Sequence, residues 1–350
     1  MKLRVKMLTK AANRDMRGFF GPFLPAGLPV LGDCLFIFNR EERNYDWLVV
    51  VDDLPSRSGE RFTLWEEVIP GNPTNTLLLT LEPSTIKAYG KDFMRQFGHV
   101  LSSQEPFAIQ HPGHIHSHAS LPWFYGKTYD EAAANFPSDK TSLISTVCSS
   151  KKQKHTLHAL RHRFTQILKQ ELPELEVYGH GHRQIDTKVT ALDPFRYHLV
   201  AENHLAVHHW TEKLADAFLG GCFPIYFGAP NIYDYFPEDS LLRVDLRDTQ
   251  SALAQINELL QSHSYEHALP AIREARRRVI EEYALFPRLS QLLPTLHQAE
   301  AIKRRREHSI LSRHAWRRKH PMRAVWYGFE RVAVRYRGQH AARRITLEKG

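Results

Sequence analysis

Short apolar runs alternate with segments of helical periodicity along the second half of this 350-residue chain. The strand-like runs are 142–148, 177–178, 197–201, 223–227 and 241–246. Between them, apolar residues recur three or four positions apart, as in Leu157, Leu160, Phe164 and Leu168. Runs that are apolar throughout suit strands buried on both faces of a parallel sheet. The alternation therefore predicts a doubly wound α/β domain in this half.

The first half contains strand-like runs of the same kind at 34–38, 47–51 and 77–81. A stretch rich in Pro, His, Gly and Ser, from about 104 to 138, separates the two halves. A chain of this length is comfortable as two domains. We therefore predict two Rossmann-like α/β domains facing a cleft, residues 1–138 and 139–300, and a helical tail of residues 301–350.

Positive charge is concentrated in the predicted tail. Residues 301–350 contain 15 Lys/Arg and three Asp/Glu, a balance of +12, against +9 for the whole chain. The first 300 residues are therefore slightly acidic, whereas a nucleic-acid-binding fold usually carries positive charge on the fold itself. The tail interleaves its basic residues with Trp316, Trp326 and Phe329, which suits an appendage lying on an anionic membrane surface. A solvated helical tail is the alternative, a nucleic-acid arm comes third, and no nucleic-acid partner is expected.

The chain lacks the sequence features of membrane insertion and export. No run of about 18 apolar residues occurs, and no continuous apolar stretch follows the basic N-terminus. The cysteines Cys34, Cys148 and Cys222 are far apart and lie in or beside apolar segments, as reduced, buried thiols do. We expect a cytoplasmic protein, peripheral on the inner membrane face through its tail.

Residues 196–245 contain the groups that a sugar nucleotide requires. Glu202–Asn203 follows a predicted strand, and ligands of open α/β sheets collect at the C-terminal ends of strands. Thr211 can cap a helix whose first turn holds Glu212 and Lys213. A lysine there opposes the helix dipole, which suggests an anionic ligand. A solvated surface lysine is the alternative, and this local pattern alone favours it.

A longer pattern decides between these interpretations. The pattern begins with Glu-Asn, followed after eight residues by Glu-Lys and a small-residue helix ending in Gly, and it ends with Phe-Pro-Ile-Tyr-Phe-Gly-Ala-Pro-Asn. This pattern resembles the signature of the family 10 α-1,3/1,4-fucosyltransferases. The match extends over about fifty residues with fixed spacing. The resemblance implies a GT-B-like fold, with an acceptor-side first domain and a GDP-fucose-binding second domain. It also implies inverting transfer of fucose to a hydroxyl of a glycan acceptor.

The resemblance assigns donor-binding roles to Arg161, Glu202, Asn203, His209, Glu212 and Lys213. Arg161 stands in an Arg-x-x-Phe-x-x-x-Leu context like that of the family, at the edge of an apolar stripe. An arginine in that place normally needs an acidic or phosphate partner, although a snorkelling surface arginine is the alternative.

The resemblance also places a catalytic base, Glu82, just after the apolar run 77–81. A carboxylate at the mouth of a domain cleft can have its pKa raised by desolvation, which suits it to accept a proton from an acceptor hydroxyl. A turn residue before Pro83 is the alternative.

Two residues depart from the family pattern. Ala201 replaces the Phe before Glu-Asn, and His209 replaces the Tyr three residues before Glu212. These departures leave open a GT-B transferase that uses another nucleotide sugar. A non-catalytic glycan- or nucleic-acid-binding protein is a further alternative.

No metal is required by the arrangement that the resemblance implies. Arg161 and Lys213 stand in for a cation, and a divalent ion would be at most stimulatory. The His-rich loop at 111–118 lacks the fixed spacing and acidic ligands of a metal site, so we interpret it as a polar loop on the acceptor side. Lipopolysaccharide and protein glycans are both compatible acceptor classes.

Overall fold

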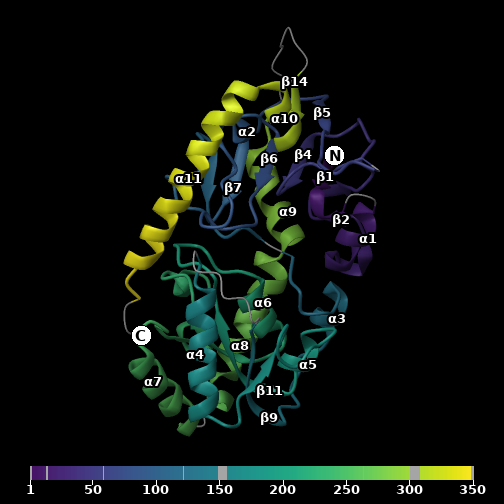
Figure 1. The fold of residues 1–350 in the computed structure, drawn as a ribbon. Helices are drawn as coiled ribbons and strands as arrows, with labels where there is room; N and C mark the ends of the chain where they lie inside the picture. Colours follow the sequence, from purple (N-terminus) through teal and green to yellow (C-terminus); the bar gives the residue numbers. More distant parts are fainter. Residues whose placement is uncertain are drawn as a thin grey trace. The chain divides into compact units, whose positions relative to one another are not determined.

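The computed structural model describes residues 2–12, 15–57, 59–120, 122–148, 156–262, 264–299 and 308–347 (Figure 1). The chain forms two compact units. Unit 1 comprises Met1–Ala119 and Leu285–Gly338, and unit 2 comprises Ser120–Ala284 and Gln339–Gly350. Each unit is built on a mainly parallel sheet, so the predicted α/β class with two sheet-containing domains is confirmed.

These bounds differ from the predicted ones because unit 1 is discontinuous in sequence. The first division lies at residue 119 rather than 138, and the segment after Ala284 returns to unit 1. Leu285, Phe286 and Leu289 belong to the apolar core of unit 1, which explains the return.

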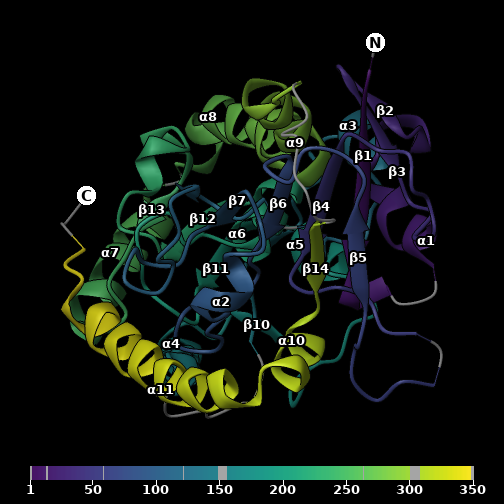
Figure 2. The ribbon, with the colours of Figure 1, turned by 90° about the horizontal axis from the view of Figure 1, so that it is seen from above.

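Unit 1 contains a seven-stranded sheet in the order β2-β3-β1-β4-β6-β7-β8, parallel except for the pair β2–β3. Its strands are β1 (Leu3–Thr9), β2 (Val30–Leu31), β3 (Cys34–Ile37), β4 (Trp47–Val51), β6 (Thr76–Leu79), β7 (His99–Ser102) and β8 (His114–His116). Every residue of β4 and of β6 is buried, as their apolar runs predict. Figure 2 shows β3, β1, β4 and β6 side by side.

The sequence analysis missed β1, which lies between β3 and β4. Its alternating basic and apolar residues look like a solvated segment, yet Lys6 is fully buried. The Lys6 ammonium lies 2.7 Å from the carboxylate of Glu67, a residue 61 positions away. The buried ion pair therefore allows a charged residue in a central strand.

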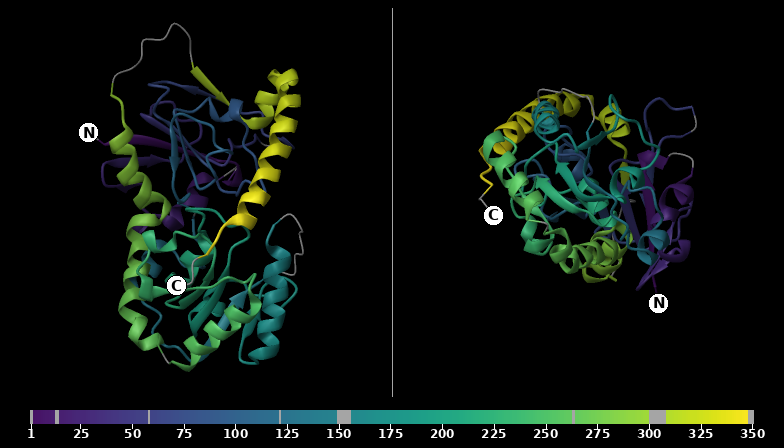
Figure 3. Two further views of the ribbon diagram at one scale, coloured as in Figure 1. Left: turned by 90° about the vertical axis from the view of Figure 1, so that its left-hand side faces the viewer. Right: turned by 90° about the horizontal axis from the view of Figure 1, so that it is seen from below.

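Most of the C-terminal segment, up to Gly338, belongs to unit 1 rather than forming an appendage, and Gln339–Gly350 belongs to unit 2. β14 (His308–Leu311) pairs antiparallel with β5 (Glu66–Ile69). α11 (Pro321–Arg344), preceded by α10 (Arg313–Lys319), packs beside α2 (Lys91–Met94), where Tyr327 donates to the carbonyl of Ala88 at 2.8 Å (Figure 2). Figure 3 shows α11 in yellow as one continuous helix. The predicted helical tail exists, but tertiary contacts hold it. The remaining helices of unit 1 are α1 (Met16–Phe20) and α9 (Leu285–Leu296).

Unit 2 contains a five-stranded, fully parallel sheet in the order β10-β9-β11-β12-β13. Its strands are β9 (Ser142–Val147), β10 (Glu176–Tyr178), β11 (Phe195–Ala201), β12 (Phe223–Phe227) and β13 (Leu242–Arg243). Its helices are α3 (Tyr129–Ala134), α4 (His158–Glu171), α5 (Val189–Leu192), α6 (Glu212–Leu219), α7 (Thr249–Gln261) and α8 (Tyr265–Arg278). The predicted strands and helices of this half are confirmed, although β13 is shorter than the apolar run that predicts it.

Within the described residues, no helix is long and apolar enough to span a bilayer. The three cysteines are buried free thiols.

Candidate active site

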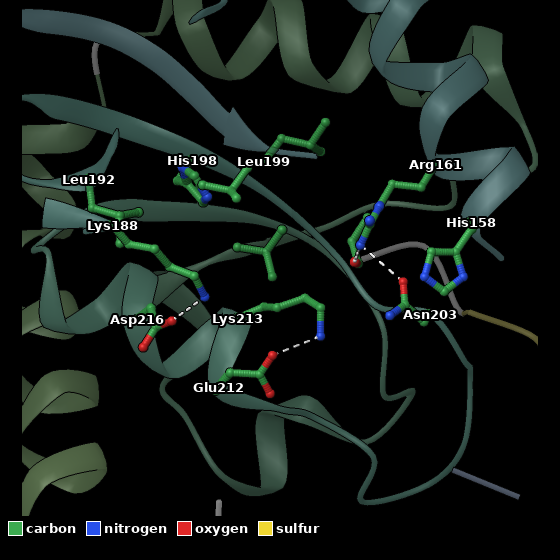
Figure 4. A pocket seen from close by; sticks show the side chains of 13 residues that line it. His158, Arg161, Lys188, Leu192, His198, Leu199, Asn203, Glu212, Lys213 and Asp216 are labelled. Carbon is green, nitrogen blue, oxygen red and sulfur yellow. Dashed lines mark hydrogen bonds and ion pairs between the residues drawn. The ribbon is translucent and has the colours of Figure 1, made fainter. Parts of the chain in front are cut away.

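A pocket of about 250 Å³ lies in unit 2, beside the C-terminal ends of β9 and β11 (Figure 4). It is lined by Val147, His158, Arg161, Lys188, Leu192, His198, Leu199, Val200, Ala201, Asn203, Glu212, Lys213 and Asp216. The lining therefore combines basic, acidic and neutral polar side chains from α4, α6 and the strand ends. Such a mixture suits a ligand that carries both phosphate and hydroxyl groups.

Glu202 follows β11 directly and organises the start of α6. Its fully buried carboxylate accepts from the backbone N–H of Thr211 at 2.9 Å and from the Thr211 hydroxyl at 2.8 Å. It also lies 3.2 Å from the ammonium of Lys213. Thr211 caps the helix, as predicted, by accepting from the N–H of Lys213. The backbone here is closely packed, since a Cβ at Gly228 would meet Glu202 Cγ at 2.8 Å.

Lys213 lies in the pocket between two carboxylates. Its Nζ is 3.2 Å from Glu202 Oε2 and 3.2 Å from Glu212 Oε1. Burial alone would lower the pKa of Lys213, but the two carboxylates outweigh it and raise that pKa above its ordinary value. Burial would raise the pKa of Glu212, yet Lys213 and Lys188 lower it. Both groups are therefore charged at neutral pH.

Arg161 comes from α4 and reaches the end of β11. Its Nη1 donates to the side-chain oxygen of Asn203 at 3.0 Å and to the carbonyl of Ala201 at 3.4 Å. The residue is 8% exposed. The Arg161 guanidinium lines the pocket, and a guanidinium has several N–H donors that suit an anionic ligand.

The structure brings four of the six predicted donor-binding residues to the pocket wall: Arg161, Asn203, Glu212 and Lys213. Glu202 lies behind the wall, where its carboxylate bonds to Thr211 and Lys213. His209 is also absent from the lining; it is 4% exposed, and its ring packs edge-on to that of His204 at 5.5 Å. Burial, His204 and Lys213 together lower its pKa well below the ordinary value, so this histidine is neutral.

The sequence analysis missed His158, Lys188, His198 and Asp216, which also line the pocket. Lys188 and Asp216 form an ion pair with an Nζ–Oδ2 distance of 2.5 Å. The signal available for Asp216 was its position one turn after Glu212 on the same predicted helix, which places both on neighbouring parts of one face. Nothing in the local sequence distinguishes Lys188 from a surface lysine.

The predicted base, Glu82, lies in unit 1. It is exposed and stands three residues after the end of β6. Gln104, which is buried, donates from Nε2 to the carbonyl of Glu82 at 2.6 Å and to that of Lys87 at 2.8 Å. These bonds fix the turn that carries the Glu82 side chain.

The His-rich loop ends in β8. Burial lowers the pKa of both His111 and His114, so these imidazoles are neutral at physiological pH. In the described part of the chain, no group of three or more His, Cys, Asp or Glu side chains is placed to hold a metal ion.

A charged pocket at the strand ends of a parallel α/β unit lies where such folds bind their ligands. The family model for glycosyltransferase family 10 (fucosyltransferase), C-terminal part, matches residues 137–268, which contain the whole pocket. These residues match the family model, and the predicted enzyme class, a fucosyltransferase, is confirmed.

Several solved glycosyltransferases are similar to this chain at low sequence identity. A crystal structure of α1,3-fucosyltransferase is 14% identical, with 81% of this chain and 91% of that chain covered and a TM-score of 0.48. The α1,3-fucosyltransferase with GDP-fucose is 14% identical, with 81% and 92% covered and a TM-score of 0.44. A glycosyltransferase from Rickettsia africae ESF-5 is 13% identical, with 85% and 100% covered and a TM-score of 0.42.

Proposed function

We propose that this fucosyltransferase moves fucose from GDP-fucose to a glycan hydroxyl with inversion at the sugar, giving an α-1,3/1,4-type linkage. The observation that supports the proposal is that Arg161 and Lys213, which come from two different helices, line the same pocket within the residues that match the family 10 model. Two cations at one place suit a diphosphate, whose negative charge grows as it leaves.

The residues of the pocket would then divide the work. Arg161 and Lys213 neutralise the leaving GDP, and Glu212 and Asn203 hold hydroxyl groups of the donor. Glu202 supports the reaction through Lys213, because its carboxylate lies 3.2 Å from the Lys213 ammonium and raises the pKa of that lysine. No metal is required in this scheme, since the two side-chain cations supply the positive charge.

Glu82 acts as the base in this scheme. The acceptor oxygen forms a bond to C1 of fucose as the bond from C1 to the phosphate oxygen breaks. GDP leaves on the opposite side, and the hydroxyl proton passes to the Glu82 carboxylate. The exposure of Glu82 supports this role, because an acceptor glycan can reach an exposed carboxylate.

The test is a donor panel measured by calorimetry and by product release. GDP-fucose is expected to bind and to be turned over, while the fucose-free control, GDP, binds without turnover. The replacement of the family's Tyr by His209 favours one second candidate, a transferase for a different nucleotide sugar. Turnover of another donor in the panel, without turnover of GDP-fucose, would establish that candidate and reject ours.

We also propose that α11 holds the enzyme on an anionic membrane from the cytoplasmic side. One face of α11 exposes large apolar side chains at helical spacing: Met322, Val325, Trp326, Phe329, Val332 and Tyr336 are 61–80% exposed. Arginines flank this face, and basic residues near an anionic bilayer contribute about 1 kcal/mol each. The acceptor would then be a membrane-associated glycan such as lipopolysaccharide, with a protein glycan as the other acceptor class.

Vesicle binding tests this location. The double variant Trp326→Ser with Phe329→Ser is expected to lose binding to anionic vesicles and keep turnover of a soluble acceptor. Leu28→Ser removes an apolar side chain of similar exposure, 58%, elsewhere in unit 1 and serves as the control. Deleting the segment is a poor test, because β14 and α10 contribute to the fold of unit 1. Unchanged vesicle binding by the double variant would reject the proposal.

A further inference from the structure

The pocket has a second polar end, which the proposed function leaves without a role. Figure 4 shows Lys188, Asp216 and His198 on the opposite side of Lys213 from Arg161 and Asn203. These residues come from three elements: the residue before α5, the second turn of α6 and the middle of β11.

Lys188 and Asp216 form a partly buried ion pair whose atoms have defined partners. Lys188 Nζ lies 2.5 Å from Asp216 Oδ2, and Asp216 Oδ1 accepts from the backbone N–H of Phe124 at 3.0 Å. Burial raises the pKa of Asp216 to about 6, against the opposing effect of Lys188. The carboxylate is therefore mostly ionised at neutral pH, and the two charges compensate each other.

The hydrogen bonds of His198 define which of its ring nitrogens can accept. Ser145 Oγ donates to the carbonyl of Ala191 at 2.5 Å, so its lone pair accepts from His198 Nδ1–H at 2.7 Å. Burial, with Lys188 and Lys140, lowers the pKa of His198 to about 3, so the ring is neutral. Nε2 consequently has no proton and is a hydrogen-bond acceptor.

A compensated ion pair beside a neutral acceptor suits hydroxyl groups better than phosphate. Each hydroxyl donates one hydrogen bond and accepts others, so it can bond to an ammonium and a carboxylate together. Phosphate, in contrast, would meet repulsion from Asp216. At the other end of the pocket, the Arg161 guanidinium, which donates to Asn203, is the group that suits a phosphate.

We propose that Lys188, Asp216 and His198 form a hydroxyl-binding subsite that recognises a sugar ring of the donor, either the ribose or the fucose. This inference rests on the proposed function, since it assumes a GDP-sugar in the pocket. It assigns specificity for the sugar to residues separate from those that bind the diphosphate.

Three ligands and two matched variants test the subsite by calorimetry. The ligands are GDP, 2′,3′-dideoxy-GDP, which lacks both ribose hydroxyls, and GDP-fucose. Lys188→Met removes the proposed donor. Lys127→Met is the control, because Lys127 forms a similar ion pair with Asp193 at 2.8 Å in the same unit but does not line the pocket.

If the subsite binds the ribose, Lys188→Met should weaken GDP binding by about tenfold and leave the affinity for dideoxy-GDP unchanged, as expected for one lost hydrogen bond to a charged group. If the subsite binds the fucose, the same loss of affinity should occur for GDP-fucose alone. Equal losses for all three ligands, or no loss, would overturn the proposal. Lys127→Met should bind all three as the wild type does.

Two further measurements keep the outcome interpretable. If Lys188→Met does not fold, as judged by its melting curve, Asp216→Asn replaces it and retains an oxygen for the Phe124 N–H. The same changes in ligand ratios are expected, and unchanged ratios overturn the proposal. A wild-type protein that binds none of the three ligands would instead contradict the proposed function.

Discussion

Glu202 and Glu82 both follow a buried strand of a parallel sheet, but their surroundings differ. Glu202 comes directly after β11, is fully buried, and has its carboxylate bonded to Thr211 and Lys213. Glu82 comes three residues after β6, is exposed, and is held through its backbone carbonyl by Gln104. The carboxylate of the first organises protein groups, whereas that of the second is accessible from solvent. In the proposed scheme, the buried and hydrogen-bonded Glu202 therefore supports Lys213, whereas the exposed Glu82 is the base.

The largest expected effect is on turnover at Glu82. Glu82→Gln keeps the shape of the side chain but removes its ability to accept a proton, so kcat should fall by about 10² to 10⁴. The affinity for GDP should stay near that of the wild type, because the proposed GDP site is built from residues of unit 2. Steady-state kinetics and calorimetry measure the two quantities.

The matched control for this variant is Glu105→Gln, a change in the segment that follows β7 of the same unit. It should retain turnover. Full activity in Glu82→Gln together with loss in Glu105→Gln would transfer the role of base to Glu105.

The next effect is on nucleotide binding at Arg161. Arg161→Ala removes a charged hydrogen-bond donor from the pocket and should weaken GDP binding by about 10- to 100-fold. Arg163→Ala changes an exposed arginine of the same helix and should leave GDP affinity unaltered. Equal affinities in the two variants would remove Arg161 from the diphosphate site.

A smaller effect should appear in stability at Glu202. Glu202→Gln removes one of the two carboxylates that compensate the partly buried Lys213, which should lower the free energy of unfolding by about 1–3 kcal/mol. Its kcat should fall less than that of Glu82→Gln. Urea unfolding measures the first quantity, and a stability equal to that of the wild type would contradict the supporting role.

The smallest expected effect is on the pH dependence of stability and concerns His198, which lies in β11, the strand that Glu202 follows. Its pKa is about 3 in the fold and near 6.5 when unfolded, so the unfolded chain binds the proton first as pH falls. The stabilisation is complete above pH 6.5 and is lost as pH falls toward 3, by about 1–2 kcal/mol at pH 5. His198→Gln should show a smaller loss between pH 7 and pH 5 by urea unfolding. Identical losses in both proteins would exclude this contribution.

The sequence patterns predict the elements that are buried through their own apolar side chains. β4, β9, β11 and β12 follow from their apolar runs, and the cap of α6 follows from Thr211. β1 was missed because Lys6 is buried through a partner 61 residues away.

The residues that line the candidate pocket could be predicted only in part. Arg161 and Lys213 follow from the family pattern and the helix start. Lys188 depends on an ion pair with Asp216 that only the tertiary structure creates. Whether Glu202 faces a ligand or supports Lys213 is likewise a matter of side-chain packing, which the pattern does not specify.

The pairing of β5 with β14 joins residues that are separated by about 240 positions. A ribosome therefore completes residues 120–284, nearly all of unit 2, before unit 1 receives its last strand and helices. Until then the edge of β5 has no partner, and unpaired edges favour aggregation. We therefore expect unit 2 to become complete before unit 1, whose strand β5 pairs only after residues 308–311 have been synthesised.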